Sequence, residues 1–266
     1  MREPHVTVVM PVRAPAPFLE QALQSVRDQS YSNWTLLVAI DGPDAGISDM
    51  MGRMFSGRSA VALKVETYTG ISSALNQAIV QVESDYIARL DADDVCHPLR
   101  LQSQVSYLED YPDCVAVGTS CQVINAASEV VGNLQLETGH DVRKAMLRRN
   151  HIMHPSVMFR RNAAVSTGLY NSECKQLEDY DLWLRMGVLG ELAVLPDSLL
   201  SYRVSGGQLS RSPSSSVGKW HLLASRIGLA RAVKAPVVPV VVNHSLWSIV
   251  QPLVSRAEIG RLRKYR

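Results

Sequence analysis

The chain has 266 residues, and 46% of them are apolar, which is enough to bury a full hydrophobic core. Its four cysteines have no Cys-x-x-Cys spacing, which argues against a disulfide or zinc scaffold and favours reduced thiols in a cytoplasmic protein. The net charge of +2 excludes little, but residues 217–266 carry nine Lys or Arg against one acid, so a mildly acidic body is joined to a basic tail.

The first 90 residues alternate between short apolar runs and amphipathic segments. The apolar runs predict strands at 5–11, 34–40, 62–68 and 86–90, and helical periodicity predicts helices at 18–29 and 70–82. Such alternation is typical of an α/β fold with a mostly parallel sheet and helices on both faces. Ligands bind such sheets beyond the carboxyl ends of the strands, and both Asp41 and Asp91 stand at such an end.

The second half has a different pattern. After a predicted helix near 100–110, the apolar segments 114–125 and 129–136 flank a short polar turn and are typical of paired strands. The remaining predicted elements are helices at 140–149 and 178–187 and strands at 155–160 and 198–204. The Gly/Ser-rich stretch 205–216 predicts a border between a domain at 1–210 and a C-terminal helical extension at 211–266.

The basic tail predicts two or three amphipathic helices interrupted by Pro236, Pro239 and Pro252. Two interpretations stay open: the tail docks on an anionic membrane surface at the cytoplasmic side, or it packs on the body of the protein. No recognisable nucleic-acid module is present, so nucleic acid is not expected as a partner. The apolar stretch 236–254 contains three prolines as well as Asn243, His244 and Gln251, which argues against a transmembrane helix.

The stretch LDADDVCHPLR, residues 90–100, places Asp91, Asp93 and Asp94 directly behind a predicted strand. One interpretation is a solvated turn that caps the next helix. The other is a divalent cation site, because Asp91 and Asp93 lie two residues apart and can converge on one ion. The positions that a calcium loop of the EF-hand type requires are held by Cys96 and Gln102, so the cation expected here is Mn²⁺ or Mg²⁺, completed by phosphate oxygens.

Residues 5 to about 210 resemble glycosyltransferase family 2. The motifs that carry the resemblance, in order, are VTVVMPV, the Asp41-Gly42 turn, LDADD, HPSVMFRR, LEDYDLWLR and LLSYR. The resemblance implies a GT-A fold, with a Rossmann-like nucleotide-binding half and an acceptor half. It also implies an inverting, metal-dependent transferase that moves a sugar from a nucleotide-diphosphate donor, usually a UDP-sugar, to a glycan or lipid-linked acceptor.

The resemblance also implies roles for residues of the donor site. Asp41 would contact the nucleobase, Asp91 the ribose or diphosphate side and, with Asp93, the metal. Pro11 ends the first predicted strand and Arg13 follows it at the same rim, where Arg13 either stacks on the base or binds phosphate, or is a solvated surface residue. The family usually has two acids before the glycine of the turn, whereas this chain has Ile40 in place of the first, which leaves the choice of base open.

Further motifs imply roles in catalysis. Asp179 would be the general base, with Glu178 contacting the acceptor or steadying the base. Both stand at a predicted helix N-terminus, which would help keep Asp179 ionised, so this role does not require a large rise in the pKa of Asp179. His154 would contact sugar or acceptor, with a hydrogen-bonded core histidine as the alternative. Arg203 would reach the diphosphate from a loop that closes over the donor.

The sequence therefore predicts a glycosyltransferase of bacterial surface polysaccharide synthesis. The alternative is a catalytically impaired module that binds nucleotide sugars, since Ser205 replaces a histidine that family members often carry after the arginine. A sugar-phosphate nucleotidyltransferase is disfavoured, because VMPVRAPAP lacks the glycine-rich loop and lysine that such an enzyme needs. The donor sugar, the acceptor and the linkage are not encoded in these motifs.

Overall fold

The structure is a computed structural model that describes all residues except 1, 57–59, 66–69, 135, 205–214 and 249–266. Its first half contains the four parallel strands that the sequence predicts. They are β1 (Val6–Val12), β2 (Trp34–Ile40), β3 (Ala60–Lys64) and β4 (Tyr86–Arg89), in the spatial order β3-β2-β1-β4. The prediction for 62–68 extends into residues outside the described part of the chain.

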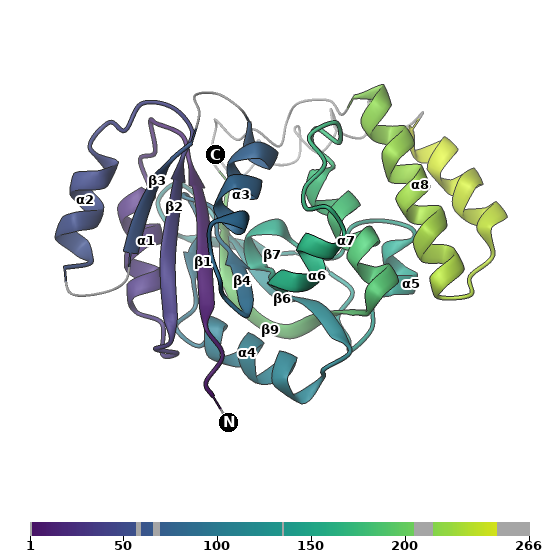
Figure 1. Cartoon of the computed structure of the whole chain (residues 1–266), viewed down its shortest axis with the longest axis horizontal. Coiled ribbons are helices and arrows are strands. Elements are labelled where there is room, and N and C mark those ends of the chain that lie inside the picture. Colours follow the sequence, from purple (N-terminus) through teal and green to yellow (C-terminus); the bar gives the residue numbers. More distant parts are fainter. Residues whose placement is uncertain (1, 57–59, 66–69, 135, 205–214, 249–266) are drawn as a thin grey trace.

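Two layers of helices cover the sheet, because successive apolar residues along its strands point to opposite faces, so both faces are apolar. Val8 and Met10 of β1 belong to one buried cluster and Val9 to the other. The first cluster contains residues from α1 (Leu19–Arg27), α2 (Ile47–Met54) and α4 (Arg100–Asp110). The second contains residues from α3 (Ile71–Val80), α5 (Arg143–Met146), α6 (Arg161–Ser166), α7 (Glu178–Leu189) and α8 (Ser216–Ala232). Both helix layers are visible in Figure 1.

The second half extends the same sheet with mixed strand directions. It adds β5 (Val95–Cys96), β6 (Cys114–Ile124), β7 (Val130–Asn133), β8 (Met158–Arg160) and β9 (Glu191–Arg203). Among the described residues the full order is β3-β2-β1-β4-β8-β6-β9-β5, with β7 paired to β6. β8 runs antiparallel to both β4 and β6, whereas β6 and β9 are parallel. The α/β fold with a C-terminal helical part is confirmed.

Some elements differ from the prediction in extent. The segment expected as a strand at 155–160 begins with the 3₁₀ turn η1 (His154–Ser156), which contains Pro155, and becomes a strand only at Met158. The predicted helix at 140–149 is the short α5. α2, α6 and β5 were not predicted, because each is short and α2 follows a strong turn signal at Asp41-Gly42-Pro43.

The described part of the tail packs on the body. Leu222, Leu229 and Ala230 of α8 are fully buried in the cluster that contains Trp183 of α7. A further helix covers 237–248 and lies beside α8 at the end of the molecule away from α2 (Figure 1). Pro239 does not break this helix, since it stands in the first turn, where the backbone N–H has no acceptor within the helix. No described helix is long and apolar enough to cross a membrane.

The junction between α7 and β9 depends on a glycine, and this gives a prediction. A Cβ at Gly190 would lie 2.4 Å from the carbonyl oxygen of Asp113 and 2.6 Å from Val115 Cγ1. Gly190→Ala should therefore lower the free energy of unfolding by about 1–3 kcal/mol. The matched control is Gly52→Ala in α2, where a Cβ meets nothing within 4 Å and helix propensity should raise stability by about 0.5–1 kcal/mol. Urea denaturation of both variants measures the two changes in the free energy of unfolding. Changes of the same sign would contradict the packing argument.

Candidate active site

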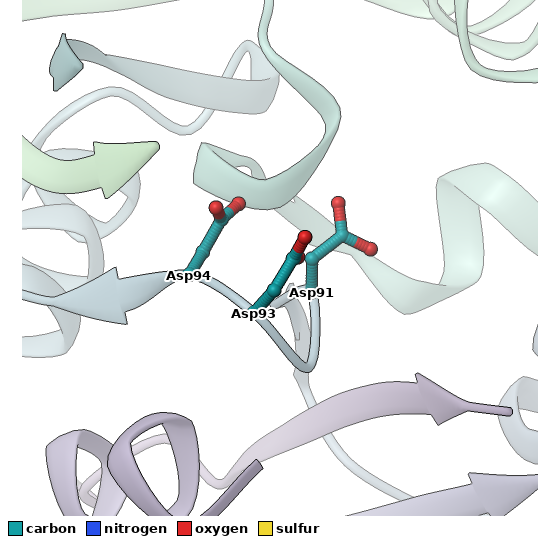
Figure 2. A group of neighbouring side chains, drawn as sticks. All are labelled: Asp91, Asp93 and Asp94. Atoms are coloured by element: carbon teal, nitrogen blue, oxygen red, sulfur yellow. The ribbon is translucent and has the colours of Figure 1, made fainter. Parts of the chain in front are cut away.

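Three carboxylates crowd the turn between β4 and β5. One oxygen from each of Asp91, Asp93 and Asp94 lies within 4.8 Å of the others, and the side chains project to one side of the turn (Figure 2). The turn is closed by a backbone hydrogen bond from the N–H of Asp94 to the carbonyl of Asp91, 3.3 Å long. The acidic turn, as we call Asp91–Asp94, is therefore an ordered structure that holds like charges together.

The three carboxylates differ in environment. Asp91 is 31% exposed and pairs with the guanidinium of Arg89. Asp94 is fully buried, and its Oδ1 accepts a 2.7 Å hydrogen bond from the backbone N–H of Arg203, while its buried Oδ2 has no partner among the residues that the structure describes. Burial and the charge of Asp91 raise the pKa of Asp93 to about 6, and the same causes, with Asp93 added, raise the pKa of Asp94 well above its ordinary value.

Arg89 is a functional candidate that the sequence motifs did not single out. It ends β4, and its side chain is only 3% exposed. Its Nη2 contacts Asp91, but Nε and Nη1 are buried without a partner in the described part of the chain. A buried cation is costly unless other charges offset it. The signal available in the sequence was a charged residue inside the otherwise apolar run YIARL.

Arg203 lies at the end of β9, fully buried, beneath the acidic turn. Its Nε donates to the carbonyl of Asp93 at 2.7 Å, and Nη1 donates to the carbonyl of Asn125 and to Ser128 Oγ. Nη2 donates to Gln21 Oε1 at 2.7 Å, and the guanidinium lies 4.2 Å from the Phe18 ring centroid. In this structure Arg203 therefore supports the turn from inside, and its contact with a diphosphate stays a prediction.

Strand register brings the first two motifs to the same edge. Val12 pairs with Ile40, so Asp41 follows β2 where β1 ends, and the backbone N–H of Asp41 donates to the carbonyl of Val12. Arg13 Nη2 lies 4.0 Å from Asp41 Oδ2, and nearly half of the Arg13 side chain remains accessible. Pro11 lies within β1, one residue before its last. This rim therefore places the Arg13 guanidinium beside the Asp41 carboxylate, and the contact of Pro11, Arg13 and Asp41 with a nucleotide stays a prediction.

Glu178 and Asp179 begin α7. Asp179 Oδ2 accepts a 3.0 Å hydrogen bond from Asn150 Nδ2, and Oδ1 accepts from the backbone N–H of Tyr180 at 2.7 Å. Glu178 is buried, and no described residue is a hydrogen-bond partner of its Oε2. Asn150 was not among the predicted site residues, because nothing in the motif pattern marks it.

The pKa of Asp179 corrects one expectation. Burial, followed by the charge of Glu178, raises this pKa to about 7, although the Tyr180 N–H and Arg89 oppose the rise. The helix N-terminus was expected to help keep Asp179 ionised, but its stabilisation of a charge is about 0.3–1 kcal/mol at exposed sites and does not outweigh burial here. Burial also raises the pKa of Glu178. At neutral pH Asp179 can therefore both hold and release a proton.

His154 lies in η1, at the same edge. β8 is antiparallel to β4, and the backbone N–H of Arg89 donates to the carbonyl of Val157, so residues before Val157 lie beyond the end of β4. The ring Nε2 is 2.9 Å from the Tyr170 hydroxyl. Burial, with the nearby Arg89, lowers the pKa of His154 well below its ordinary value, so the ring is neutral. It is hydrogen-bonded to a side chain rather than to backbone, and its contact with a sugar stays a prediction.

The two acidic groups belong to one site. Burial raises the pKa of Tyr170, and the charges of Asp179, Glu178 and Asp91 add to that rise while Arg89 opposes it. Tyr170 therefore lies in the electric field of both the acidic turn and the start of α7. The structure brings together Asp91, Asp93, Asp94, Arg89, His154, Tyr170, Glu178 and Asp179.

The acidic turn fits a hard divalent cation. Its donors are carboxylate oxygens, which Mn²⁺ and Mg²⁺ prefer. The raised pKa values of Asp93 and Asp94 reflect burial first and then the negative charge of their neighbours, which a cation would neutralise, and Asp94 Oδ2 is a buried oxygen with an unused acceptor. Asp91 and Asp93 are the more accessible of the three carboxylates and would be the ligands.

Comparison with known proteins places the chain among sugar transferases. The model of the family "Glycosyl transferase family 2" matches residues 7–164. Amylovoran biosynthesis glycosyltransferase AmsE of Erwinia amylovora is 29% identical over 216 residues, which cover 80% of this chain and 79% of that protein. O-antigen biosynthesis glycosyltransferase WbnJ of Escherichia coli is 29% identical over 220 residues, which cover 78% of this chain and 82% of that protein.

Solved structures show the same fold at low sequence identity. S. aureus TarS 1-349 in complex with UDP-GlcNAc superposes with a TM-score of 0.70 at 15% identity, over 86% of this chain and 66% of that one. Mannosyltransferase PcManGT from Pyrobaculum calidifontis, in complex with GDP-Man and Mn²⁺, superposes with a TM-score of 0.61 at 14% identity, over 99% and 85%. These two likenesses confirm the expected GT-A fold.

The raised carboxylate pKa values predict how stability depends on pH. Between about pH 4 and pH 7 Asp93 and Asp179 bind more protons in the folded than in the unfolded state, because their pKa values are about 6 and about 7 when folded. Their contribution to the free energy of unfolding of the metal-free protein should therefore fall as the pH rises through this window, whereas the lowered pKa values of His154 and His244 contribute in the opposite direction. Asp93→Asn should remove its share of this fall and raise stability at pH 8 by about 1 kcal/mol, allowing for partial solvation.

Urea denaturation in EDTA at several pH values from 4 to 8 measures this dependence. Asp110→Asn, at the exposed end of α4, is the control for loss of one surface carboxylate. A profile for Asp93→Asn that runs parallel to that of the unaltered protein would show that Asp93 does not titrate as stated.

Proposed function

We propose that this chain, which belongs to glycosyltransferase family 2, is an inverting, metal-dependent transferase that moves a sugar from a UDP-linked donor to a glycan or lipid-linked acceptor in bacterial surface polysaccharide synthesis. The observation that carries the proposal is the meeting of two acidic groups across Tyr170 and Arg89. One group can hold a metal and the other has a carboxylate with a pKa of about 7. Names of related proteins support the polysaccharide context.

The donor would lie along the carboxyl edge of the sheet. Asp41 and Arg13 would contact the nucleoside, and Asp91 and Asp93 would hold Mn²⁺ or Mg²⁺ with the diphosphate. When bound, such an ion stabilises the negative charge that develops on the departing diphosphate. A UDP-GlcNAc complex and a complex with GDP-Man and Mn²⁺ among the structural neighbours support this placement, and so does the unused acceptor on Asp94.

Asp179 would act as the general base. Its Oδ2 would take the proton from an acceptor hydroxyl as that oxygen attacks the anomeric carbon, while the bond from that carbon to the diphosphate oxygen breaks on the opposite face. This displacement inverts the anomeric configuration. Asn150, which donates to Oδ2, would fix the orientation of the carboxylate, and Glu178 and His154 would line the sugar and acceptor region.

The central prediction concerns Asp179→Asn. This variant should bind UDP with Mn²⁺ as the unaltered protein does, while UDP release from UDP-glucose, UDP-galactose or UDP-N-acetylglucosamine should fall about 10²- to 10⁴-fold. In the unaltered protein, kcat/KM should rise with pH through about pH 7, because only the ionised carboxylate accepts a proton. Calorimetry measures UDP binding, and a coupled assay measures release.

An EDTA arm separates the alternatives. Chelation should remove both UDP binding and turnover, whereas Asp179→Asn should remove turnover alone. Near-normal turnover by Asp179→Asn would refute its assignment as the base. Metal-dependent UDP binding with no turnover of any donor by the unaltered protein would favour the impaired binding module.

We also propose that the tail brings the enzyme to the inner face of an anionic membrane. The helix 237–248 exposes Val238, Val242 and Leu246, at 74%, 53% and 59%, and their spacing of four residues places them along one stripe. Arg231 and Lys234 lie just before this helix, and the sequence from 256 to 266 adds five basic residues against one acid. An apolar stripe with basic neighbours is complementary to an anionic lipid surface.

The membrane proposal predicts a loss of vesicle binding. The triple change Val238→Ser, Val242→Ser and Leu246→Ser should weaken cosedimentation with phosphatidylserine vesicles about tenfold or more, because three apolar side chains no longer enter the interface. The matched control is Val61→Ser with Val130→Ser, two exposed valines of the sheet, at 52% and 58%. Equal vesicle binding by both variants, or binding that high salt leaves unchanged, would exclude this mode of docking.

A further inference from the structure

A fully buried arginine of the tail lies behind the proposed catalytic base. Arg226 of α8 forms no ion pair in the described part of the chain. Its Nη1 lies 3.1 Å from His244 Nδ1, and its guanidinium lies 5.1 Å and 5.3 Å from the ring centroids of Tyr180 and Trp247. Burial and Arg226 lower the pKa of His244 to about 4, so the ring is neutral and Nδ1 accepts the hydrogen bond.

The second terminal nitrogen of Arg226, Nη2, reaches both segments that hold Asp179, whereas its buried Nε has no hydrogen-bond partner among the described residues. Nη2 donates to the Tyr180 hydroxyl and to the carbonyl of Arg148, each at 3.1 Å. Tyr180 is the residue after Asp179, and its hydroxyl donates to the carbonyl of Met146. The carbonyls of Met146 and Arg148 belong to the segment that ends at Asn150, and Asn150 Nδ2 donates to Asp179 Oδ2. The segment 146–150 and the first turn of α7 are thus joined through one guanidinium.

Simple adhesion of α8 to the body does not require this arginine. Leu222 and Leu229 of the same helix already bury apolar side chains against the body. A buried guanidinium without a carboxylate is costly, and apolar residues of similar volume often pack as well or better. Aromatic faces and neutral acceptors offset part of that cost. What the guanidinium adds is a set of specific hydrogen bonds. Each of them leads to a group within four residues of Asp179 or Asn150, or to the helix 237–248.

We propose that Arg226 is a positioning residue for the transfer reaction, by which the tail fixes Asn150 and Tyr180 so that Asn150 holds the Asp179 carboxylate in its reactive orientation. This inference rests on the proposed role of Asp179 as the base. It assigns the tail a part in catalysis that does not depend on membrane docking.

Loss of the Arg226 hydrogen bonds should alter proton transfer at Asp179. The groups that face Asp179 are Glu178 and Tyr180 of its own helix, Arg89 of β4, Tyr170, and Asn150. A hydrogen bond to the ionised carboxylate favours that form. Loss of the Asn150 contact should therefore move the pH at which Asp179 ionises upward.

The test uses the full chain with Arg226→Met and the milder Tyr180→Phe, which removes only the hydroxyl. Both should lower kcat for UDP release from a UDP-sugar with Mn²⁺, Arg226→Met by about ten- to a hundredfold, as a small misplacement of a reacting group does. The donor KM should stay within about twofold, and the acid limb of the kcat profile should move to higher pH.

The matched control is Arg160→Met at the opposite edge of the sheet. Arg160 also donates to main-chain carbonyls and to a tyrosine hydroxyl, and its guanidinium also lies over a tyrosine ring, that of Tyr86. The Arg160→Met variant should lose stability, whereas the acid limb of its kcat profile against pH should not move. If Arg226→Met and Tyr180→Phe match this control, or retain the kcat of the unaltered protein, the proposal is wrong.

Combination with Asn150→Ala tests the route. If Arg226 acts through Asn150, the double variant should be no slower than Asn150→Ala alone, to within about twofold. If the double variant instead showed the product of the two single losses in kcat, Arg226 would not act through Asn150.

A measurement without turnover separates this inference from the proposed function. The difference in unfolding free energy between the unaltered protein and Asp179→Asn, followed against pH in EDTA, reports where Asp179 ionises. When both proteins also carry Arg226→Met, this transition should lie at higher pH, and an unmoved transition would refute the positioning role. Normal turnover by Asp179→Asn would instead refute the base assignment itself, whatever Arg226→Met does.

Discussion

The crowding of Asp91, Asp93 and Asp94 is the constraint on which the rest of the site depends. Arg89 pairs with Asp91 and the backbone of Arg203 donates to Asp94, yet burial and mutual repulsion still raise the pKa of Asp93 to about 6. The fold therefore offsets only part of the negative charge. What remains would favour a bound cation, and a nucleotide diphosphate alone, being an anion, would add to the repulsion. Nucleotide and cation are thus expected to bind together.

The reversal of strand direction at β8 brings the other candidate site residues to the same edge as this turn. β1, β2 and β4 end at one edge because they are parallel, and β8 begins there because it is antiparallel to β4. The loop that leads into β8 contains Asn150 and His154, so both arrive at the edge without a separate crossover. α7 then starts next to Asn150. A parallel strand at this position would have delivered the same residues to the far edge.

The sequence predicted those features that depend on local periodicity. Asp41 and Asp91 were placed correctly at strand ends, because the apolar runs before them have clear lengths. Arg89 and Asn150 were not found, since a charge inside a strand and an amide in a loop acquire their roles only from tertiary neighbours. The pKa of Asp179 was misjudged for the same reason. Position at a helix N-terminus is visible in the sequence, whereas burial beside Glu178 is not.

The two roles proposed for the tail use different surfaces and do not compete. The inner surface, with Leu222, Arg226 and His244, is buried against the body and α7. The outer stripe of Val238, Val242 and Leu246 is exposed. Because Arg226 contacts His244 of the second helix as well as Tyr180 of α7, the outer stripe is attached to the helix that carries Asp179 in its first turn. An enzyme held at a membrane through that stripe would keep its base at a fixed height above the lipid, which suits an acceptor that is itself anchored there.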